Sequence, residues 1–425
     1  MTAAPTPAVA PQQPRIGSTA VFLTILAGLG WVGPFSIDTM FPAFTQIGAE
    51  WGASEFALQQ IISVYMLAFA VMSLFHGPLS DSLGRRPEII VAVALYVLAS
   101  IGSALAPNLG MLLVFRALQG LSAGAGQIIS RAMVRDVYSD SQAQRTMSHI
   151  AMIFAIAPAL APVVGGWLLG VGNWRTIFWF LAGFGVLLLA AVLFALPETH
   201  PKQNRTAFSG RSLAGGLLQV WRSRDARRLA FAGLFNFAGQ FLYISAAQLF
   251  VVKLLGLGDQ DFWVLFLPLI SGMVVGSWLS GRLAGRLNGR RLASLGYLVT
   301  FSAAVVNVAL SLIPATSVLP WVILPLPFYS FGVALAFPII TLAMLDLFPQ
   351  RRGAASSVQS FVSLLGNAAV AGLLAPALGF SLWSLAVGAL VLTGIGWAFW
   401  RRHLAKTKIE PHGSSDAPAF EPIVE

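Results

Sequence analysis

Long apolar runs dominate this chain, and they constrain its fold more than any other feature. Of its 425 residues, 57% are hydrophobic and only 10% are charged, whereas about a quarter of the residues of a soluble domain are charged. A soluble core cannot bury one run of about 20 apolar residues after another. We therefore expect an all-α integral membrane protein with room for roughly ten to fourteen membrane spans.

Hydropathy predicts twelve spans, which place both termini on one side of the membrane. The predicted spans are residues 19–44, 58–79, 88–106, 110–133, 146–170, 174–196, 229–254, 262–284, 292–313, 319–344, 354–377 and 379–400. The longest polar connection separates six spans from six. The expected organisation is a disordered tail over 1–17, a six-helix bundle over 18–196, a linker over 197–228, a second six-helix bundle over 229–404 and a disordered tail over 405–425.

The basic residues indicate the orientation. Of the 26 Lys and Arg residues, all except Arg116, Arg175 and Lys253 lie on the side of the tails, either in the tails and connections there or at the span ends next to them. Basic residues are retained in cytoplasmic loops. Both termini are therefore predicted to be cytoplasmic, and the net charge of +10 reflects membrane topology rather than nucleic-acid binding.

An internal repeat supports the division into halves. The segment from Gly77 to Arg86 follows the second span, and a similar segment from Gly281 to Arg291 follows the eighth, with Gly285 where the first copy has Asp81. Two pseudo-symmetric halves with a binding site between them are typical of secondary transporters.

Two charged residues are predicted to lie well inside spans. Asp38 is the only acid there and Arg116 the only cation, and a charge in the bilayer is costly unless it is paired, hydrated or neutralised. The helical rise places them about 9 Å and about 10 Å from the outer ends of their helices. A proton-coupling role follows, with either a direct pair or a separation across a hydrated cavity. The alternatives are a permanent structural ion pair, or Asp38 satisfying backbone groups freed by Pro34 and Pro42.

The segment after the second span is predicted to form a cytoplasmic gate. Gly77 and Gly84 allow close helix approach, Asp81 can meet a helix N-terminus, and Arg85 and Arg86 can hold carbonyls or lipid phosphates. A simple topology anchor is the alternative, and it explains the arginines only.

The fifth span carries Pro158, Pro162, Gly165 and Gly166. Prolines bend a helix and glycines allow close packing. The pattern predicts either a hinge or a kinked packing helix without a coupling role.

Polar and aromatic residues predict an amphipathic cavity between the halves. Asn236, Gln240 and Tyr243 share one face of the seventh span because they are four and three residues apart. The other expected lining residues are Trp31, Phe35, Tyr65, Phe69, Gln119, Gln127 and Gln248. Hydrogen bonding between helices is the alternative role for any single one of them.

Other chemistry has little support in the sequence. There is no phosphate-binding loop of the form G-x-x-x-x-G-K-[ST]. The string from Gly120 to Gly124 matches G-x-S-x-G, but it lies inside the predicted span 110–133 and not at a turn between a strand and a helix, as a nucleophile elbow requires. The chain has no cysteine, and its five histidines lack metal-ligand spacing. We expect no cofactor, no metal and no enzymatic activity; a membrane enzyme, a receptor or an uncoupled facilitator is the alternative to a coupled transporter.

The motifs together resemble the major facilitator superfamily. The segment from Gly77 to Arg86 resembles its signature loop, Arg116-Ala-Leu-Gln119-Gly120 its fourth-helix motif, and the run from Ala157 to Gly166 its antiporter motif. The strings Pro34-Phe-Ser-Ile-Asp38, Ser130-Arg131-Ala-Met-Val-Arg135-Asp136, Trp174-Arg175-Thr-Ile-Phe178 and Leu196-Pro197-Glu198-Thr199 resemble the bicyclomycin-resistance (Bcr/CflA) branch of drug-efflux proton antiporters.

This resemblance implies a monomer in the bacterial inner membrane that exports small organic molecules in exchange for protons, by alternating access. Its partners would be a small-molecule substrate, protons and membrane lipid, and no nucleic acid. Two positions depart from the branch: Gln248 stands where a proline is expected, and His76 stands where an aromatic residue is expected.

Overall fold

The computed structural model describes residues 19–138, 146, 157–158, 160–283 and 287–407, and these residues are predominantly helical. The helices of the first half are α1 (Thr19–Asp38), η1 (Phe41–Ala43), α2 (Phe44–Trp51), α3 (Glu55–Ser73), α4 (His76–Leu83), α5 (Arg85–Ala104), α6 (Leu109–Val137), the segment Leu160–Val171 and α8 (Trp174–Ala195). The linker contains η2 (Lys202–Asn204) and α9 (Gly210–Arg222).

The second half is also helical. Its elements are α10 (Arg224–Ser245), η3 (Leu249–Leu254), α11 (Trp263–Leu283), α12 (Gly289–Leu312), η4 (Pro314–Thr316), α13 (Leu326–Asp346), η5 (Pro349–Arg351), α14 (Arg352–Ala369), η6 (Val370–Leu374), α15 (Ala375–Leu378) and α16 (Leu382–Thr407). The predicted tails, residues 1–17 and most of 405–425, lie outside the described residues.

Ten helices of the described chain are long and apolar enough to cross a membrane. The fifth predicted span is only partly described, as the apolar helix Leu160–Val171. The seventh is α10, which begins at Arg224 rather than residue 229 and carries charged residues in its first turns.

The predicted end of the second span is wrong. The second span does not continue to residue 79, because α3 ends at Ser73 and a separate helix, α4, begins at His76. Pro78 is tolerated in α4 because it lies in the first turn, where backbone N–H groups have no helical partner. Most of the predicted loop from Gly77 to Arg86 is therefore helical, and only Gly84 separates α4 from α5.

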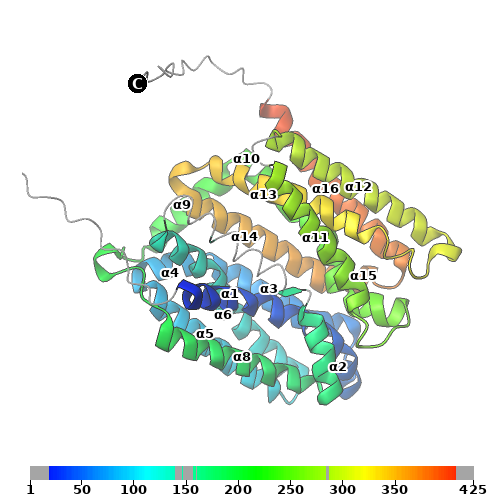
Figure 1. The fold of residues 1–425 in the computed structure, drawn as a ribbon, viewed down its shortest axis with the longest axis horizontal. Coiled ribbons are helices and arrows are strands. Elements are labelled where there is room, and N and C mark those ends of the chain that lie inside the picture. Colours follow the sequence, from blue (N-terminus) through cyan, green and yellow to red (C-terminus); the bar gives the residue numbers. More distant parts are fainter. Residues whose placement is uncertain (1–18, 139–145, 147–156, 159, 284–286, 408–425) are drawn as a thin grey trace, which may run out of the picture.

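The two halves of the chain lie side by side (Figure 1). In the first half α6 packs on α1, α3 and α5, and α5 packs on α8; in the second half α13 packs on α11 and α12, and α10 packs on α16. Between the halves, α3 packs on α14 and η6. Residues far apart in sequence thus meet along one central interface.

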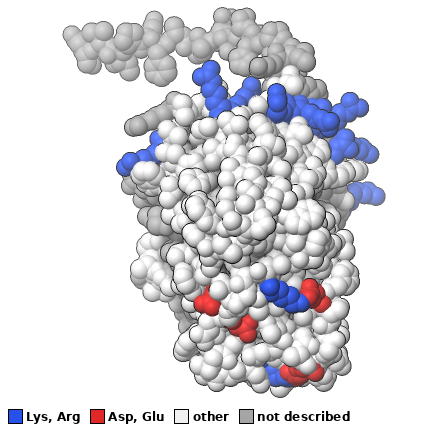
Figure 2. All heavy atoms as spheres, turned by 90° about the vertical axis from the view of Figure 1, so that its right-hand side faces the viewer, with Lys and Arg blue, Asp and Glu red and all other residues white. Residues whose placement is uncertain are grey.

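The charged residues are distributed unequally between the two ends of the helices. Figure 2 shows Lys and Arg side chains gathered at one end of one face and Asp and Glu side chains toward the other. We call these the basic end and the acidic end. At the acidic end, Arg175 pairs with Glu50 at 2.8 Å, and Lys253 pairs with Glu55.

Candidate functional site

At the acidic end, polar contacts join the two halves. Side chains of α3 donate hydrogen bonds to three backbone carbonyls of the second half: Gln59 to Ser245 at 3.0 Å, Gln60 to Gly372 at 3.0 Å and Ser63 to Ala368 at 2.9 Å. We call this set of six residues the acidic-end seal.

The carbonyls of the seal are available because the helices are irregular there. The residue four positions after Gly372 is Pro376, which has no N–H to donate back to it. Ala368 precedes the π-helical segment η6, and Ser245 is the last residue of α10. Breaks in the second half therefore create the acceptors that α3 uses.

A loop of the second half adds to the closure. Asp259 accepts a hydrogen bond from the hydroxyl of Thr45 at 3.2 Å, and Gln248 donates to the same hydroxyl at 3.4 Å. Burial raises the pKa of the Asp259 carboxyl, and the hydrogen bond from Thr45 partly opposes this. Gln248 thus lies in an interface between the halves. Its hydrogen-bond partner, Thr45, is not one of the predicted cavity residues.

Two glycines of the fifth-span motif lie at close backbone contacts. A Cβ atom at Gly165 would collide with the carbonyl of Thr39, just after α1 ends, and one at Gly166 would lie 2.8 Å from the carbonyl oxygen of Asp259. Pro162 is buried in the same helix and Pro158 is partly buried. The motif therefore packs the fifth span against α1 and against the second half, and its role as a hinge stays a prediction.

Asp38 is the last residue of α1 and is only 4% exposed. Its carboxyl group makes no hydrogen bond or ion pair with any residue that the structure describes. The alternative in which Asp38 satisfies backbone groups freed by Pro34 or Pro42 is therefore not supported. A buried carboxyl without a partner is an expensive arrangement for the ionised form.

Arg116 is fully buried, but its partners are not carboxylates. Its Nε donates to the carbonyl of Ile61 at 3.0 Å and its Nη1 donates to Gln119 Oε1 at 2.9 Å. The guanidinium carbon lies 4.4 Å from the centre of the Tyr65 ring, while Nη2 has no hydrogen-bond partner in the described chain. The direct pair between Asp38 and Arg116 is absent in this conformation.

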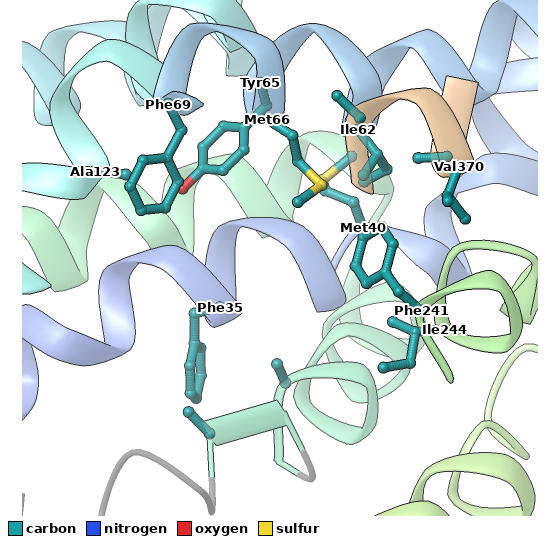
Figure 3. Close-up of a cluster of buried hydrophobic side chains, with 14 of the residues drawn as sticks. Phe35, Met40, Ile62, Tyr65, Met66, Phe69, Ala123, Phe241, Ile244 and Val370 are labelled. Atoms are coloured by element: carbon teal, nitrogen blue, oxygen red, sulfur yellow. The ribbon is translucent and has the colours of Figure 1, made fainter. Parts of the chain in front are cut away.

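The predicted cavity residues fall into separate groups. Figure 3 shows Tyr65 and Phe69 together on α3, while Phe35 projects from α1 on the side away from α3. The Phe35 ring packs against Trp31 at 5.2 Å and against Phe184 of α8 at 6.0 Å between centroids. The structure therefore does not place Trp31 and Phe35 with Tyr65 and Phe69.

The seventh-span residues make hydrogen bonds within the second half. Asn236 donates to the carbonyl of Val333 at 3.1 Å, and Asn307 donates to the Tyr243 hydroxyl at 2.6 Å. These contacts match the interhelical alternative. Gln240 is also buried, and its Oε1 lacks a described partner.

The fourth helix supplies the last two predicted lining residues. Gln119 is buried and donates to Ser100 at 2.7 Å, while Gln127 is partly exposed.

Arg85 is the centre of a polar network at the basic end. It donates to Ser80 at 2.6 Å, to Asp81 at 2.5 Å and, through Nε, to Asp136 of α6 at 3.1 Å. The carboxylate of Glu198 accepts from the backbone N–H of Arg85 at 3.1 Å. The network fastens α4 and α5 to α6 and to the segment after α8.

Arg86 extends this network within the first half. Its backbone N–H donates to Glu198 at 3.3 Å and its Nη2 donates to the carbonyl of Leu193 at 2.6 Å. Among the hydrogen bonds of the described residues, those of Arg85, Arg86 and Asp81 reach the first half and the linker, and none reaches the second half. The two halves are therefore joined by hydrogen bonds at the acidic end and not by this network.

Comparison with known proteins identifies the family. The profile of the Major Facilitator Superfamily matches residues 20–371. The chain belongs to the major facilitator superfamily. It is 27% identical to a bicyclomycin resistance protein homolog of Haemophilus influenzae, over 84% of this chain and 89% of that protein. It is 28% identical to multidrug resistance protein D of Escherichia coli, over 83% of this chain and 87% of that protein.

Solved structures of the superfamily share the fold. A D-xylose-proton symporter superposes with a TM-score of 0.69 at 16% identity, covering 90% of this chain and 98% of that one. The human organic anion transporter MFSD10 gives 0.67 at 17% identity, covering 90% and 99%. The prediction of a helical membrane protein with the major facilitator fold is thus confirmed.

This major facilitator chain also contains polar groups that the sequence did not single out for a role. His76 and Glu88 form a buried pair, with 2.8 Å between Nδ1 and Oε1. Glu88 is the first residue of the predicted span 88–106, and no sequence pattern links it to His76. Likewise, Gln59, Gln60 and Ser63 gave no signal, because their importance depends on carbonyls about 185 to 310 residues away.

Proposed function

We propose that this protein is a secondary active transporter that exports small organic compounds in exchange for protons. The single observation that carries the proposal is Asp38: a buried carboxyl group without a described partner, in a fold whose members move solutes across membranes. The names of its relatives, which refer to bicyclomycin and multidrug resistance, support an organic drug or metabolite as the exported solute.

The proposed orientation places the basic end in the cytoplasm, because basic residues are retained there. Both termini and the linker over 197–228 are then cytoplasmic, in a bacterial inner membrane. The bundles over 18–196 and 229–404 move relative to each other, and the protein acts as a monomer surrounded by lipid. The described conformation is then closed toward the outside by the acidic-end seal.

The coupling follows from the cost of burying a charge. While the seal is closed, burial of Asp38 without a partner favours the neutral, proton-bound carboxyl group. When the halves separate, hydration stabilises the carboxylate, so the conformation and the proton occupancy depend on each other. Arg116, held by Ile61 and Tyr65, is positioned to stabilise negative charge in another conformation. The network around Arg85 serves as a cytoplasmic gate by keeping the end of the first bundle rigid.

Transport in proteoliposomes tests the proposal, with bicyclomycin as the first compound. Wild-type protein is expected to move the compound against its gradient when a pH gradient is applied, without ATP. Asp38→Asn is expected to fold but to lose this coupling, because the amide mimics the protonated acid and cannot release a proton. Asp346→Asn, an acid at the basic end of α13, is the control and retains coupling.

Each of the other outcomes would indicate a different function for this protein. Equal gradient-driven transport by wild-type and Asp38→Asn protein would exclude Asp38 as the proton site. Downhill flux that ignores the pH gradient would indicate an uncoupled facilitator. Chemical conversion of the compound would indicate an enzyme. If bicyclomycin is not moved, a panel of drugs and metabolites screened in an efflux-deficient host selects the compound for the same assay.

A further inference from the structure

We propose that the His76–Glu88 pair is a second proton-binding site, located between the buried charges and the basic end of the protein. This inference rests on the proposed proton antiport. It assigns a role to two residues that the transport site described above does not use.

The geometry of the pair is that of a buried proton acceptor. His76 begins α4 and Glu88 lies in the first turn of α5, and their side chains are 2% and 7% exposed. His76 Nδ1 lies 2.8 Å from Glu88 Oε1. The other polar atoms, His76 Nε2 and Glu88 Oε2, are buried and have no hydrogen-bond partner in the described chain. Each residue thus keeps one unused position for a proton or for water.

A purely structural role does not explain why His76 Nε2 and Glu88 Oε2 are buried without a hydrogen-bond partner in the described chain. Burial of two charges costs several kcal/mol, and apolar side chains of similar size commonly stabilise a protein as well or better. Histidine differs from an apolar residue because it gains and loses a proton near neutral pH.

Ring contacts place the pair on the basic-end side of the buried charges. Tyr65 interacts electrostatically with both Asp38 and Arg116. Its ring contacts that of Phe69, with 6.4 Å between centroids. The position that a Cβ atom would occupy at Gly124 lies 2.5 Å from the Phe69 ring and 3.1 Å from His76 Cδ2. Gly124 therefore allows both rings to approach α6, which brings His76 next to Phe69.

The charges around the pair connect it to the basic end. Besides His76, the charged groups that act on Glu88 are Arg85 and Asp81. Arg85 is bound to Asp81, whose side chain is 46% exposed, and to Asp136.

Among the described residues, no other charged side chain forms a hydrogen bond or ion pair with His76 or Glu88. On α6, Arg131 and Arg135 follow Gly124, but of the charged residues there only Asp136 joins the Arg85 network. After α8, Glu198 binds the backbone of Arg85 and Arg86 and pairs with Arg205. On α3, the titratable residues are Tyr65 and, at the opposite end, Glu55.

The proton balance is simple. With Glu88 ionised, Nδ1 of a neutral His76 donates to the carboxylate and Nε2 is free to accept. A proton that reaches the pair binds at Nε2 and forms an imidazolium, which the Glu88 carboxylate stabilises. Loss of the Nδ1 proton through Glu88 toward the basic end, followed by return of the ring to its first tautomer, completes the transfer. One proton enters and one leaves.

The experiment varies only the pH on the basic-end side of proteoliposomes. The probe is the first compound shown to be moved by wild-type protein in the assay above. For wild type, transport is expected to depend on this pH. His76→Gln should remove that dependence and slow transport about tenfold. This is a smaller loss than positioned acid–base groups give in chemical catalysis, because conformational change limits transport.

A second variant separates proton transfer from folding. His76→Phe/Glu88→Leu replaces the pair with apolar groups and is expected to fold as stably as wild type, yet to lack the basic-end pH dependence. A structural role predicts the reverse: a pH dependence equal to that of wild type once folding is restored. His403→Gln changes a buried histidine of the second half and is the matched control, with unchanged pH dependence.

The outcomes also distinguish this inference from the proposed antiport. If wild-type transport ignores every pH gradient, proton antiport itself is excluded. If wild type is coupled and Asp38→Asn is uncoupled, but His76→Gln and the double variant retain the wild-type pH dependence, the antiport stands and the second proton site is overturned.

Discussion

The guanidinium of Arg116 lies 4.4 Å from the centre of the Tyr65 ring and pairs with no carboxylate of the described chain. A cation over an aromatic face is stabilised by the ring's electrons, but less than by a carboxylate. Arg116 is therefore a buried charge that the fold tolerates, and a transport role explains why it is there.

Replacement of Arg116 by methionine is expected to abolish coupled transport without destabilising the protein. Desolvation of a buried ion costs several kcal/mol, which offsets the roughly 1.5–3 kcal/mol contributed by each of its two charged hydrogen bonds. Thermal unfolding in detergent should give a stability equal to wild type, or up to about 2 kcal/mol higher.

Tyr65→Phe is the companion variant for this measurement. It keeps the ring beneath Arg116 and removes a hydroxyl that has no hydrogen-bond partner among the described groups. It should leave stability unchanged. A marked loss of stability in Arg116→Met alone would show that the arginine has a structural role.

Weakening of the acidic-end seal should favour the conformation that is open at that end. Gln60→Ala removes the hydrogen bond to Gly372, which contributes about 1 kcal/mol, so the open population should rise about fivefold. The chain has no native cysteine, so a reporter Ala371→Cys, buried beside the seal, can be labelled with a membrane-impermeant maleimide.

Thr24→Ala is the control for the seal, because Thr24 donates only to Ala20 in its own helix. It should leave reporter labelling at the wild-type rate. Equal labelling in Gln60→Ala and wild type would mean that Gln60 does not hold the halves together.

Acid should stabilise the closed acidic end through Asp259. Burial raises the pKa of this carboxyl in the closed form, whereas exposure on opening returns it toward about 3.9. The closed form therefore binds the proton more tightly, and it loses this advantage as the pH rises through the raised pKa. Labelling of the Ala371→Cys reporter should increase over that interval, and Asp259→Asn should remove the increase.

Two controls accompany the pH series. Thiolate formation itself increases labelling at higher pH, so rates are normalised to Ala315→Cys, an exposed position in the loop after α12. Asp261→Asn alters a neighbouring acid that accepts a hydrogen bond from Gly258 N at 2.9 Å within the same loop. Asp261→Asn should preserve the pH response of labelling. Loss of the response in this variant would mean that the whole loop, and not Asp259 alone, is responsible.

Two glycines of the signature segment should respond oppositely to alanine. Gly84 has a φ of 104°, and an added Cβ would lie 2.6 Å from Glu198 Oε2, so Gly84→Ala should cost about 1–3 kcal/mol. Gly77 lies in helix α4 with nothing within 4 Å of an added Cβ, so Gly77→Ala should be neutral or stabilise by about 0.5–1 kcal/mol. Thermal unfolding in detergent measures both, and equal effects would contradict this account of Gly84.

The sequence alone determined the membrane-spanning class, most helix positions and the family. These follow from composition and local spacing: apolar runs must be buried in lipid, and the motifs occur in the expected order. The burial of Asp38 and Arg116 was also predictable, since their neighbours along each helix are apolar. The end of α3 at Ser73 was not, because hydropathy continues through Leu74 and Phe75 while the helix breaks.

Only the tertiary structure decided which groups meet. Arg116 contacts Tyr65 and not Asp38, Phe35 faces α8 and not Phe69, and the seal joins α3 to carbonyls in the second half. The pairing of His76 with Glu88 depends on how α4 turns at Gly84. Hydropathy reports the depth of a residue in the membrane, whereas a contact between helices depends on their rotation and on which conformation the halves adopt. These are properties of the packed protein, and no local pattern encodes them.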